Sequence, residues 1–96
     1  MVGESSRSIH YQRPADVACE DVKRAFSSIG SVLEASPLTR TVMGRTRYGL
    51  QAVRLRVSVH AVDDGTSRID IQGFGDDIWG GGARKGADKL IRALGG

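Results

Sequence analysis

The segment from residue 51 to residue 73 constrains the fold most, because it has the pattern of an antiparallel hairpin. Apolar and polar residues alternate along Gln51–Val62, which is typical of a strand with one buried face. Asp63-Asp64-Gly65-Thr66 then favours a tight turn, and Ser67–Gly73 alternates again. We therefore predict two paired strands with these inward positions: Val53, Leu55, Val57, Val59, Ala61, Ile69 and Ile71.

Two further segments have the periodicity of amphipathic helices, and their apolar residues have identical spacing. The first begins at Pro14, with its apolar stripe at Ala18, Val22, Ala25, Phe26 and Ile29. Gly30 follows, where a left-handed C-cap is expected. The second runs from about Gly82 to Leu94, with its stripe at Ala83, Ala87, Leu90, Ile91 and Leu94. Each helix is thus predicted to bury one face.

The remaining strand signals are shorter and lie at residues 8–11, 31–35 and 38–48. Helices and strands that each have one apolar face can bury those faces by packing against each other as two layers, so we predict an α+β domain. It has an antiparallel sheet of three to five strands, two helices on one face and the order β-α-β-β-β(-β)-α. With 96 residues the chain forms a single domain, predicted over residues 7–94 after a flexible N-terminus at residues 1–6.

Residues 15–94 resemble known architectures in pattern. A strand Val-Arg-Leu-Arg-Val-Ser-Val turns through Asp-Asp-Gly-Thr into Arg-Ile-Asp-Ile, and a helix with Lys-Gly-Ala-Asp-Lys-Leu-Ile closes the domain. This arrangement is similar to small uncharacterised bacterial α+β domains. The element order also resembles the half-repeat of TATA-binding-protein-like folds and a shortened helix-grip fold. The resemblance implies a fold and assigns no function.

Composition excludes several classes of protein. Cys19 is the only cysteine, so an internal disulfide and an all-cysteine metal site are excluded. His10 and His60 have no further metal ligands at a suitable spacing, and we predict no metal and no cofactor. No apolar run approaches the length of a membrane span and no secretory signal is evident, so we expect a cytoplasmic protein that contacts no membrane.

The glycine-rich segment 73–86 lies between a strand and a helix, where phosphate-binding loops occur. It fails both specific tests, because Ala87 and Asp88 replace the Lys-Ser/Thr of a Walker A loop and Ile78 replaces the last glycine of a dinucleotide fingerprint. We interpret it as a connection whose glycines let the helix approach the sheet closely. Arg84 and Lys85, at the start of the second helix, form a weak candidate anion site.

The distribution of basic residues is more informative about function than the glycine-rich segment. Residues 40–60 contain five arginines and no carboxylate, and the net charge of the chain is +3. The strand alternation places Arg54, Arg56 and His60 on the outer face, with Arg68 on the next strand. These four residues, with Arg84 and Lys85, are the predicted surface for an anion or a partner. The alternative is a solvated face, with Asp70 and Gln72 as cross-strand partners.

These observations lead to a ranked interpretation of function. The first is a non-enzymatic binding or interaction domain that uses its open basic sheet face for self-association or partner docking. The second is a carrier of a small apolar ligand between sheet and helices, and the third is weak binding of nucleic acid or another anion. No nucleophile-elbow or other catalytic pattern is present, so we predict no catalytic residues and no enzymatic activity. A homodimer or a protein partner is expected.

Overall fold

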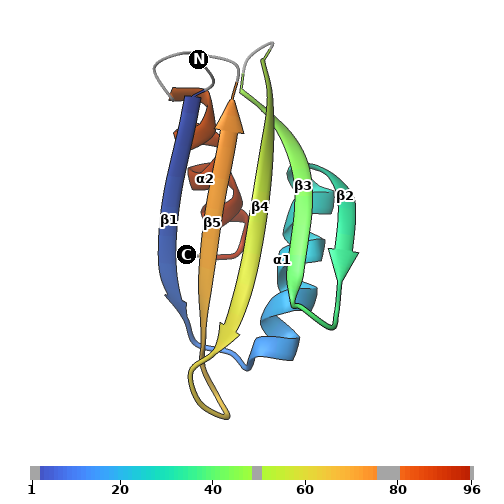
Figure 1. Cartoon of the computed structure of the whole chain (residues 1–96), viewed down its shortest axis with the longest axis vertical. Helices are drawn as coiled ribbons and strands as arrows, with labels where there is room; N and C mark the ends of the chain where they lie inside the picture. Colours follow the sequence, from blue (N-terminus) through green and yellow to red (C-terminus); the bar gives the residue numbers. More distant parts are fainter. Residues whose placement is uncertain (1–2, 49–50, 76–80, 96) are drawn as a thin grey trace.

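The structure is a computed structural model, and it describes residues 3–48, 51–75 and 81–95. It confirms the predicted α+β class, with five strands and two helices in the order β-α-β-β-β-β-α (Figure 1). The elements are β1 Gly3–Tyr11, α1 Ala15–Ile29, β2 Gly30–Ser36, β3 Thr41–Tyr48, β4 Gln51–Ala61, β5 Ser67–Gly75 and α2 Gly81–Ala93.

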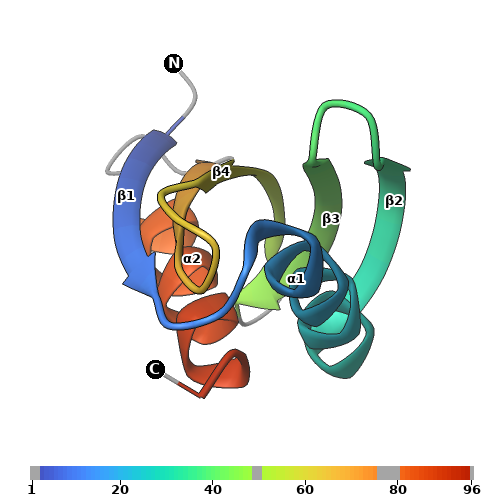
Figure 2. The ribbon, with the colours of Figure 1, turned by 90° about the horizontal axis from the view of Figure 1, so that it is seen from below.

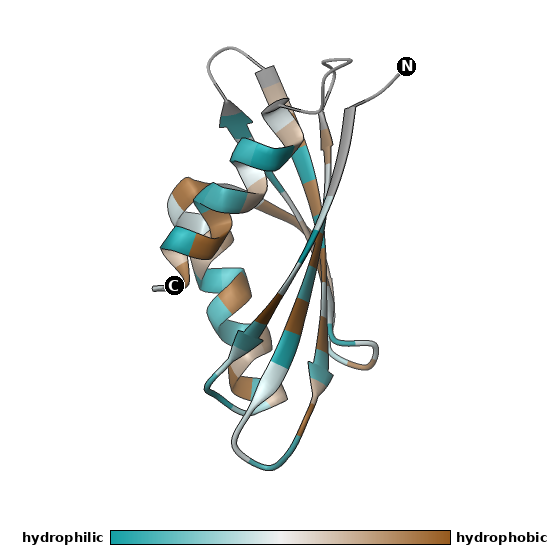
Figure 3. Ribbon diagram, turned by 90° about the vertical axis from the view of Figure 1, so that its left-hand side faces the viewer, coloured by the Kyte–Doolittle hydropathy of each residue, from teal (hydrophilic) through white to brown (hydrophobic). Residues whose placement is uncertain are grey.

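The strands form one antiparallel sheet in the order β1-β5-β4-β3-β2, so the first strand pairs with the last. The strands curve in an arc around the two helices, which lie side by side within it (Figure 2). Both helices cover the same face of the sheet, and no helix of the described residues lies on the other face (Figure 3). The predicted two-layer arrangement is therefore confirmed, and it leaves one sheet face open.

The core between the layers contains most of the residues that the two periodicities predict, together with Ala15 and Cys19 from α1 and Val42 from β3. Phe26 and Leu90 from the helices and Leu55 from β4 have no exposed surface. The inward residues of β4 and β5 are buried as predicted, except that Ala61, at the end of β4, is exposed. Neither α1 nor α2, over the described residues, is long and apolar enough to cross a membrane.

Two glycine-containing regions show why the layers can approach so closely. A Cβ atom on Gly73 would lie 2.8 Å from the Ala83 carbonyl oxygen, and one on Gly86 would lie 2.8 Å from the Val53 side chain. The described part of segment 73–86 thus fits the predicted close contact of helix and sheet. Residues 76–80 of that segment lie outside the described residues.

Gly30 differs from its predicted role. Its φ is 177°, which is extended backbone, so it is not the left-handed C-cap that its position after Ile29 indicates. A Cβ atom there would lie 1.8 Å from the Arg45 carbonyl oxygen on β3. A glycine is therefore needed at this position because β3 passes directly beside it, and α1 continues into β2 without a loop.

The first strand is longer than predicted, since it begins at Gly3 and not at Ser8. Residues 3–6, expected to belong to a flexible N-terminus, pair in register with residues 72–75 of β5. Residues 3–6 are all small or polar, so they show no alternation of apolar and polar residues that would predict a strand. Arg7 on β1 forms an ion pair with Asp88 on α2, which connects this strand to the helix layer.

Candidate functional site

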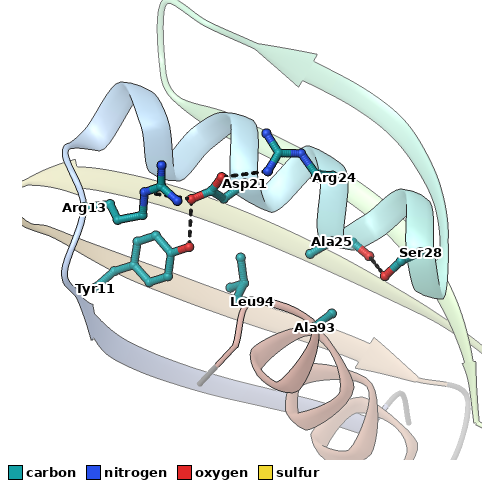
Figure 4. Close-up of a pocket in the computed structure, with 8 residues that line it drawn as sticks. All are labelled: Tyr11, Arg13, Asp21, Arg24, Ala25, Ser28, Ala93 and Leu94. Carbon is teal, nitrogen blue, oxygen red and sulfur yellow. Dashed lines mark hydrogen bonds and ion pairs between the residues drawn. The ribbon is translucent and has the colours of Figure 1, made fainter.

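A cleft opens between the two helices, at the end of β1. It has a volume of about 320 Å³, within the range of small-molecule sites (Figure 4). Tyr11 and Arg13 line it from β1 and the following loop, and the last residues of α2 close its opposite side. The complete lining is Tyr11, Arg13, Asp21, Arg24, Ala25, Ser28, Ala93 and Leu94.

Asp21 is the centre of the polar side of this cleft. Its side chain is only 8% exposed, although it is a carboxylate on the inner side of α1. The Tyr11 hydroxyl donates a hydrogen bond of 2.8 Å to Asp21 Oδ2. Arg24 Nη1 lies 3.3 Å from Oδ1, and Arg13 Nε lies 3.5 Å from Oδ2. Both carboxylate oxygens therefore have partners, as a buried charge requires.

The surroundings of Tyr11 alter its chemistry. Burial raises the pKa of Tyr11 above its ordinary value, and the hydrogen bond to Asp21 raises it further. Tyr11 is thus a neutral phenol at physiological pH. It holds its proton toward the Asp21 carboxylate, while its own oxygen can still accept a hydrogen bond.

The two arginines provide unused hydrogen-bond donors at the rim. Arg13 and Arg24 each direct one nitrogen at Asp21, and their side chains are 55% and 77% exposed. A guanidinium has five N–H donors, so each arginine can also bind an oxygen atom of a ligand. Ala93 and Leu94 face this polar group across the cleft (Figure 4). The site therefore combines an apolar wall with a row of donors and one carboxylate.

The predicted surface residues are only partly brought together. Arg54, Arg56 and His60 all project from the open face of β4, as predicted, and are exposed. His60 and Arg68 contact the same carboxylate: His60 Nε2 lies 3.1 Å and Arg68 Nε 3.2 Å from Asp70. This end of the face thus contains the predicted cross-strand partner.

Asp70 has a third contact, which also affects its titration. The Ser8 hydroxyl donates a hydrogen bond of 2.6 Å to Asp70 Oδ1. This hydrogen bond and the Arg68 charge lower the pKa of Asp70 below its ordinary value.

Arg84 and Lys85 do not join this group. They lie on the first turns of α2, in the helix layer, and their side chains are exposed. The sheet separates them from the open face that carries Arg54 and Arg56 (Figure 3). A single anion surface comprising all six predicted residues is therefore excluded by the layer arrangement.

Several other candidates have structural roles. Cys19 is buried, and burial raises the pKa of its thiol, opposite to the activation of a catalytic cysteine. Asp63 accepts hydrogen bonds from the backbone of Gly65 and Thr66 at 2.9 and 2.8 Å, so it stabilises the predicted hairpin turn. Asp76 and Asp77, the second acidic pair, lie outside the described residues.

His10 and His60 lie on the outer strand faces, as expected, and both are register partners of Arg68. Among the described residues, no three His, Cys, Asp or Glu side chains are grouped so that they could hold a metal ion.

Sequence reasoning missed Tyr11, Asp21 and the two cleft arginines. Asp21 lies within the predicted first helix, but the helix was predicted from its apolar residues alone. A signal was present, because Asp21 lies three residues after Ala18 and four before Ala25, on the apolar stripe of α1. A carboxylate at such a position needs partners from other elements, and those partners cannot be identified without the tertiary structure.

Comparison with known proteins yields a likeness in structure alone. No protein-family model matches the chain, and no curated protein matches it in sequence. Among solved structures it is similar to the Zhui aromatase/cyclase from Streptomyces sp. R1128, with a TM-score of 0.60 and 10% sequence identity. The match covers 98% of this chain and 84% of the other. At this identity the likeness shows a shared fold.

This comparison corrects two predictions. A non-enzymatic interaction domain that docks through its open sheet face is wrong as the leading interpretation, and so is the prediction of no enzymatic activity, because a solved structure with a similar fold is described as an aromatase/cyclase. The alternative of a small-ligand site between sheet and helices is better supported. The cleft that could hold such a ligand forms at the edge of the two layers, between α1, the end of α2 and the end of β1.

Proposed function

We propose that the chain binds a small, largely apolar molecule with a carbonyl or hydroxyl oxygen, in the cleft between α1, α2 and the end of β1. The observation that carries this proposal is the buried Asp21 carboxylate, which faces a cleft and is held there by Tyr11 and two arginines. The fold likeness to an aromatase/cyclase supports it. A cytoplasmic location and a homodimer stay predictions.

The lining determines which kind of molecule fits. The wall formed by Ala25, Ala93 and Leu94 favours an apolar ring or short chain, and the arginine N–H groups favour an oxygen acceptor at one end. The polar group contains two guanidinium groups and one carboxylate, so a ligand carboxylate would be attracted by the arginines as well as repelled by Asp21. We therefore expect naphthol-like compounds, whose oxygen can accept a hydrogen bond from an arginine, to bind better than unsubstituted naphthalene.

Ligand-dependent stabilisation tests this proposal. The thermal midpoint should rise with the concentration of 2-naphthol, because a ligand at about 100 times its Kd stabilises the folded state by ~2.7 kcal/mol. Ala93→Phe fills the cleft and should abolish the rise. Leu38→Phe is the matched control, since Leu38 is 96% exposed on the β2–β3 turn and far from the cleft lining. An equal rise in both variants, or none in the unmodified chain, would contradict cleft binding.

A second candidate function is proton transfer in the same cleft, favoured by the Tyr11–Asp21 hydrogen bond. The Asp21 carboxylate would take a proton from the carbon beside a ligand carbonyl, and an arginine N–H would stabilise the resulting enolate oxygen. In D₂O the proton on the Asp21 carboxyl group exchanges with solvent, and a deuteron is then returned to the same carbon, so the ketone is recovered with deuterium in place of hydrogen. The chain should then catalyse deuterium exchange into 2-tetralone, measured by NMR, and Asp21→Asn should slow it by about 10²-fold or more.

A further inference from the structure

The open face of the sheet holds a second hollow, separate from the cleft. It has a volume of about 740 Å³ and lies over β2, β3, β4 and β5. Three arginines and three large apolar side chains line most of it: Arg45, Arg54, Arg56, Leu33, Met43 and Phe74. The hollow is thus both basic and apolar.

Strand register explains how the arginines gather. Arg54 on β4 lies directly opposite Arg45 on β3, and Phe74 on β5 is its partner on the other side. Arg56 lies one step further along β4, opposite Met43. Like charges directly opposite on neighbouring strands destabilise a sheet. Folding alone therefore gives no reason for this arrangement.

Among the described residues, these three arginines have no acidic partner. In the described parts of the chain, neither a carboxylate nor any other side chain pairs with Arg45, Arg54 or Arg56. Glu34 is the register partner of Met43 on the edge strand but forms no ion pair with them. The three guanidinium groups thus retain their full capacity for a bidentate anion.

We propose that this hollow binds a discrete amphipathic anion, with an apolar body and one carboxylate, sulfate or phosphate group. The arginines would hold the anionic group, and Leu33, Met43 and Phe74 would contact the body. Leu33 is 50% exposed, so it has apolar surface to bury on binding. This inference does not depend on the cleft.

The surroundings favour a single small molecule over a polyanion. The net charge of the chain is only +3, which gives little attraction to nucleic acid or an anionic membrane. Asp70 on the same face and Glu34 at its edge would also face the phosphates of an extended polyanion. A hollow of this volume is in the range of small-molecule sites.

Titration calorimetry with three probes below their self-association limits tests the proposal. Decanoate carries both features, decan-1-ol only the apolar body, and inorganic sulfate only the charge. We expect decanoate to bind at least about tenfold more tightly than either of the others, since a hydrogen bond to a charged group contributes ~1.5–3 kcal/mol. Equal binding of decan-1-ol or sulfate would overturn the proposal.

Matched variants locate the site. Arg54→Gln/Arg56→Gln should weaken decanoate binding by about tenfold or more. Arg84→Gln/Lys85→Gln removes the same charge from α2 and should change it by less than about twofold, because long-range charge contributes little in salt. Ala93→Phe, which fills the cleft, should likewise leave it unchanged, which separates this site from the cleft. An equal loss in the two double variants would overturn the proposal, as would a loss in Ala93→Phe.

Two further titrations distinguish the source of the anion. Phosphatidylglycerol vesicles and a 20-base single-stranded DNA serve as probes for a membrane and for nucleic acid. Weak binding of both, beside clear binding of decanoate, supports the discrete ligand. Binding of either probe with no binding of decanoate would overturn it. Circular dichroism of every variant confirms that the fold is retained.

Discussion

The two faces of β4 differ completely in character, although they belong to one strand. Toward the helices, Val53, Leu55 and Val57 have no exposed surface. Toward solvent, Arg54 and Arg56 are exposed and basic. Because the covered face must exclude water, its residues report mainly on folding. The open face has no such constraint, so the placement of charges there is more informative about function.

The open face is itself divided into two ends. At one end Asp70 interacts with Ser8, His60 and Arg68. At the other end Arg45 and Arg54 lie opposite each other, and among the described residues no carboxylate forms an ion pair with either. Both ends are rich in basic residues, and the Asp70 carboxylate distinguishes them.

The largest expected effect is on the covered face. Leu90→Ala should lower the free energy of unfolding by about 2–5 kcal/mol, because Leu90 is fully buried against the sheet and its loss leaves a cavity. Urea denaturation measures the change. Arg92→Ala, on the exposed side of the same helix, is the control and should change stability by less than about 0.5 kcal/mol. Similar values for both variants would show that α2 does not pack as described.

Much of the fold could be predicted from the sequence, because burial imposes a period on each element. The period of two in β4 and β5 and the period of 3.6 in the helices specified the covered faces. Periodicity failed where burial does not determine the sequence. Residues 3–6 of β1 are polar, and Gly30 reflects close contact with β3, which depends on sheet topology.

The sites were less predictable, because each combines residues from distant parts of the chain. Strand alternation alone placed Arg54 and Arg56 on one face, and the structure confirms this. The opposition of Arg45 and Arg54 depends on the β3–β4 register, which the alternation of a single strand does not determine. The contact of Tyr11 with Asp21 also requires knowing where β1 ends relative to α1.

A smaller effect on stability is expected at the end of the open face where Asp70 contacts Ser8, His60 and Arg68. Asp70→Asn should destabilise the chain at neutral pH by up to about 1 kcal/mol, the scale of partly exposed ion pairs. The pKa of Asp70 is lower in the folded chain than its ordinary 3.8, so its contribution is present above that pH and is lost as the pH falls through the folded value. Urea denaturation should show a larger difference between variant and unmodified chain at pH 6 than at pH 2.5. A difference of the same size at both pH values would exclude the ionised carboxylate as its cause.

The smallest effects are expected when an arginine is replaced by glutamine at each of the two ends of the open sheet face. Arg54→Gln relieves repulsion from Arg45, so it should raise the free energy of unfolding by a few tenths of a kcal/mol. Arg68→Gln removes an ion pair with Asp70 and should lower it by a similar amount. Both changes should shrink at 1 M salt, where the Debye length is only about 3 Å. Urea denaturation at low and high salt measures all four values. Destabilisation by Arg54→Gln would mean that the arginine cluster stabilises the fold. Its presence would then need no ligand to explain it.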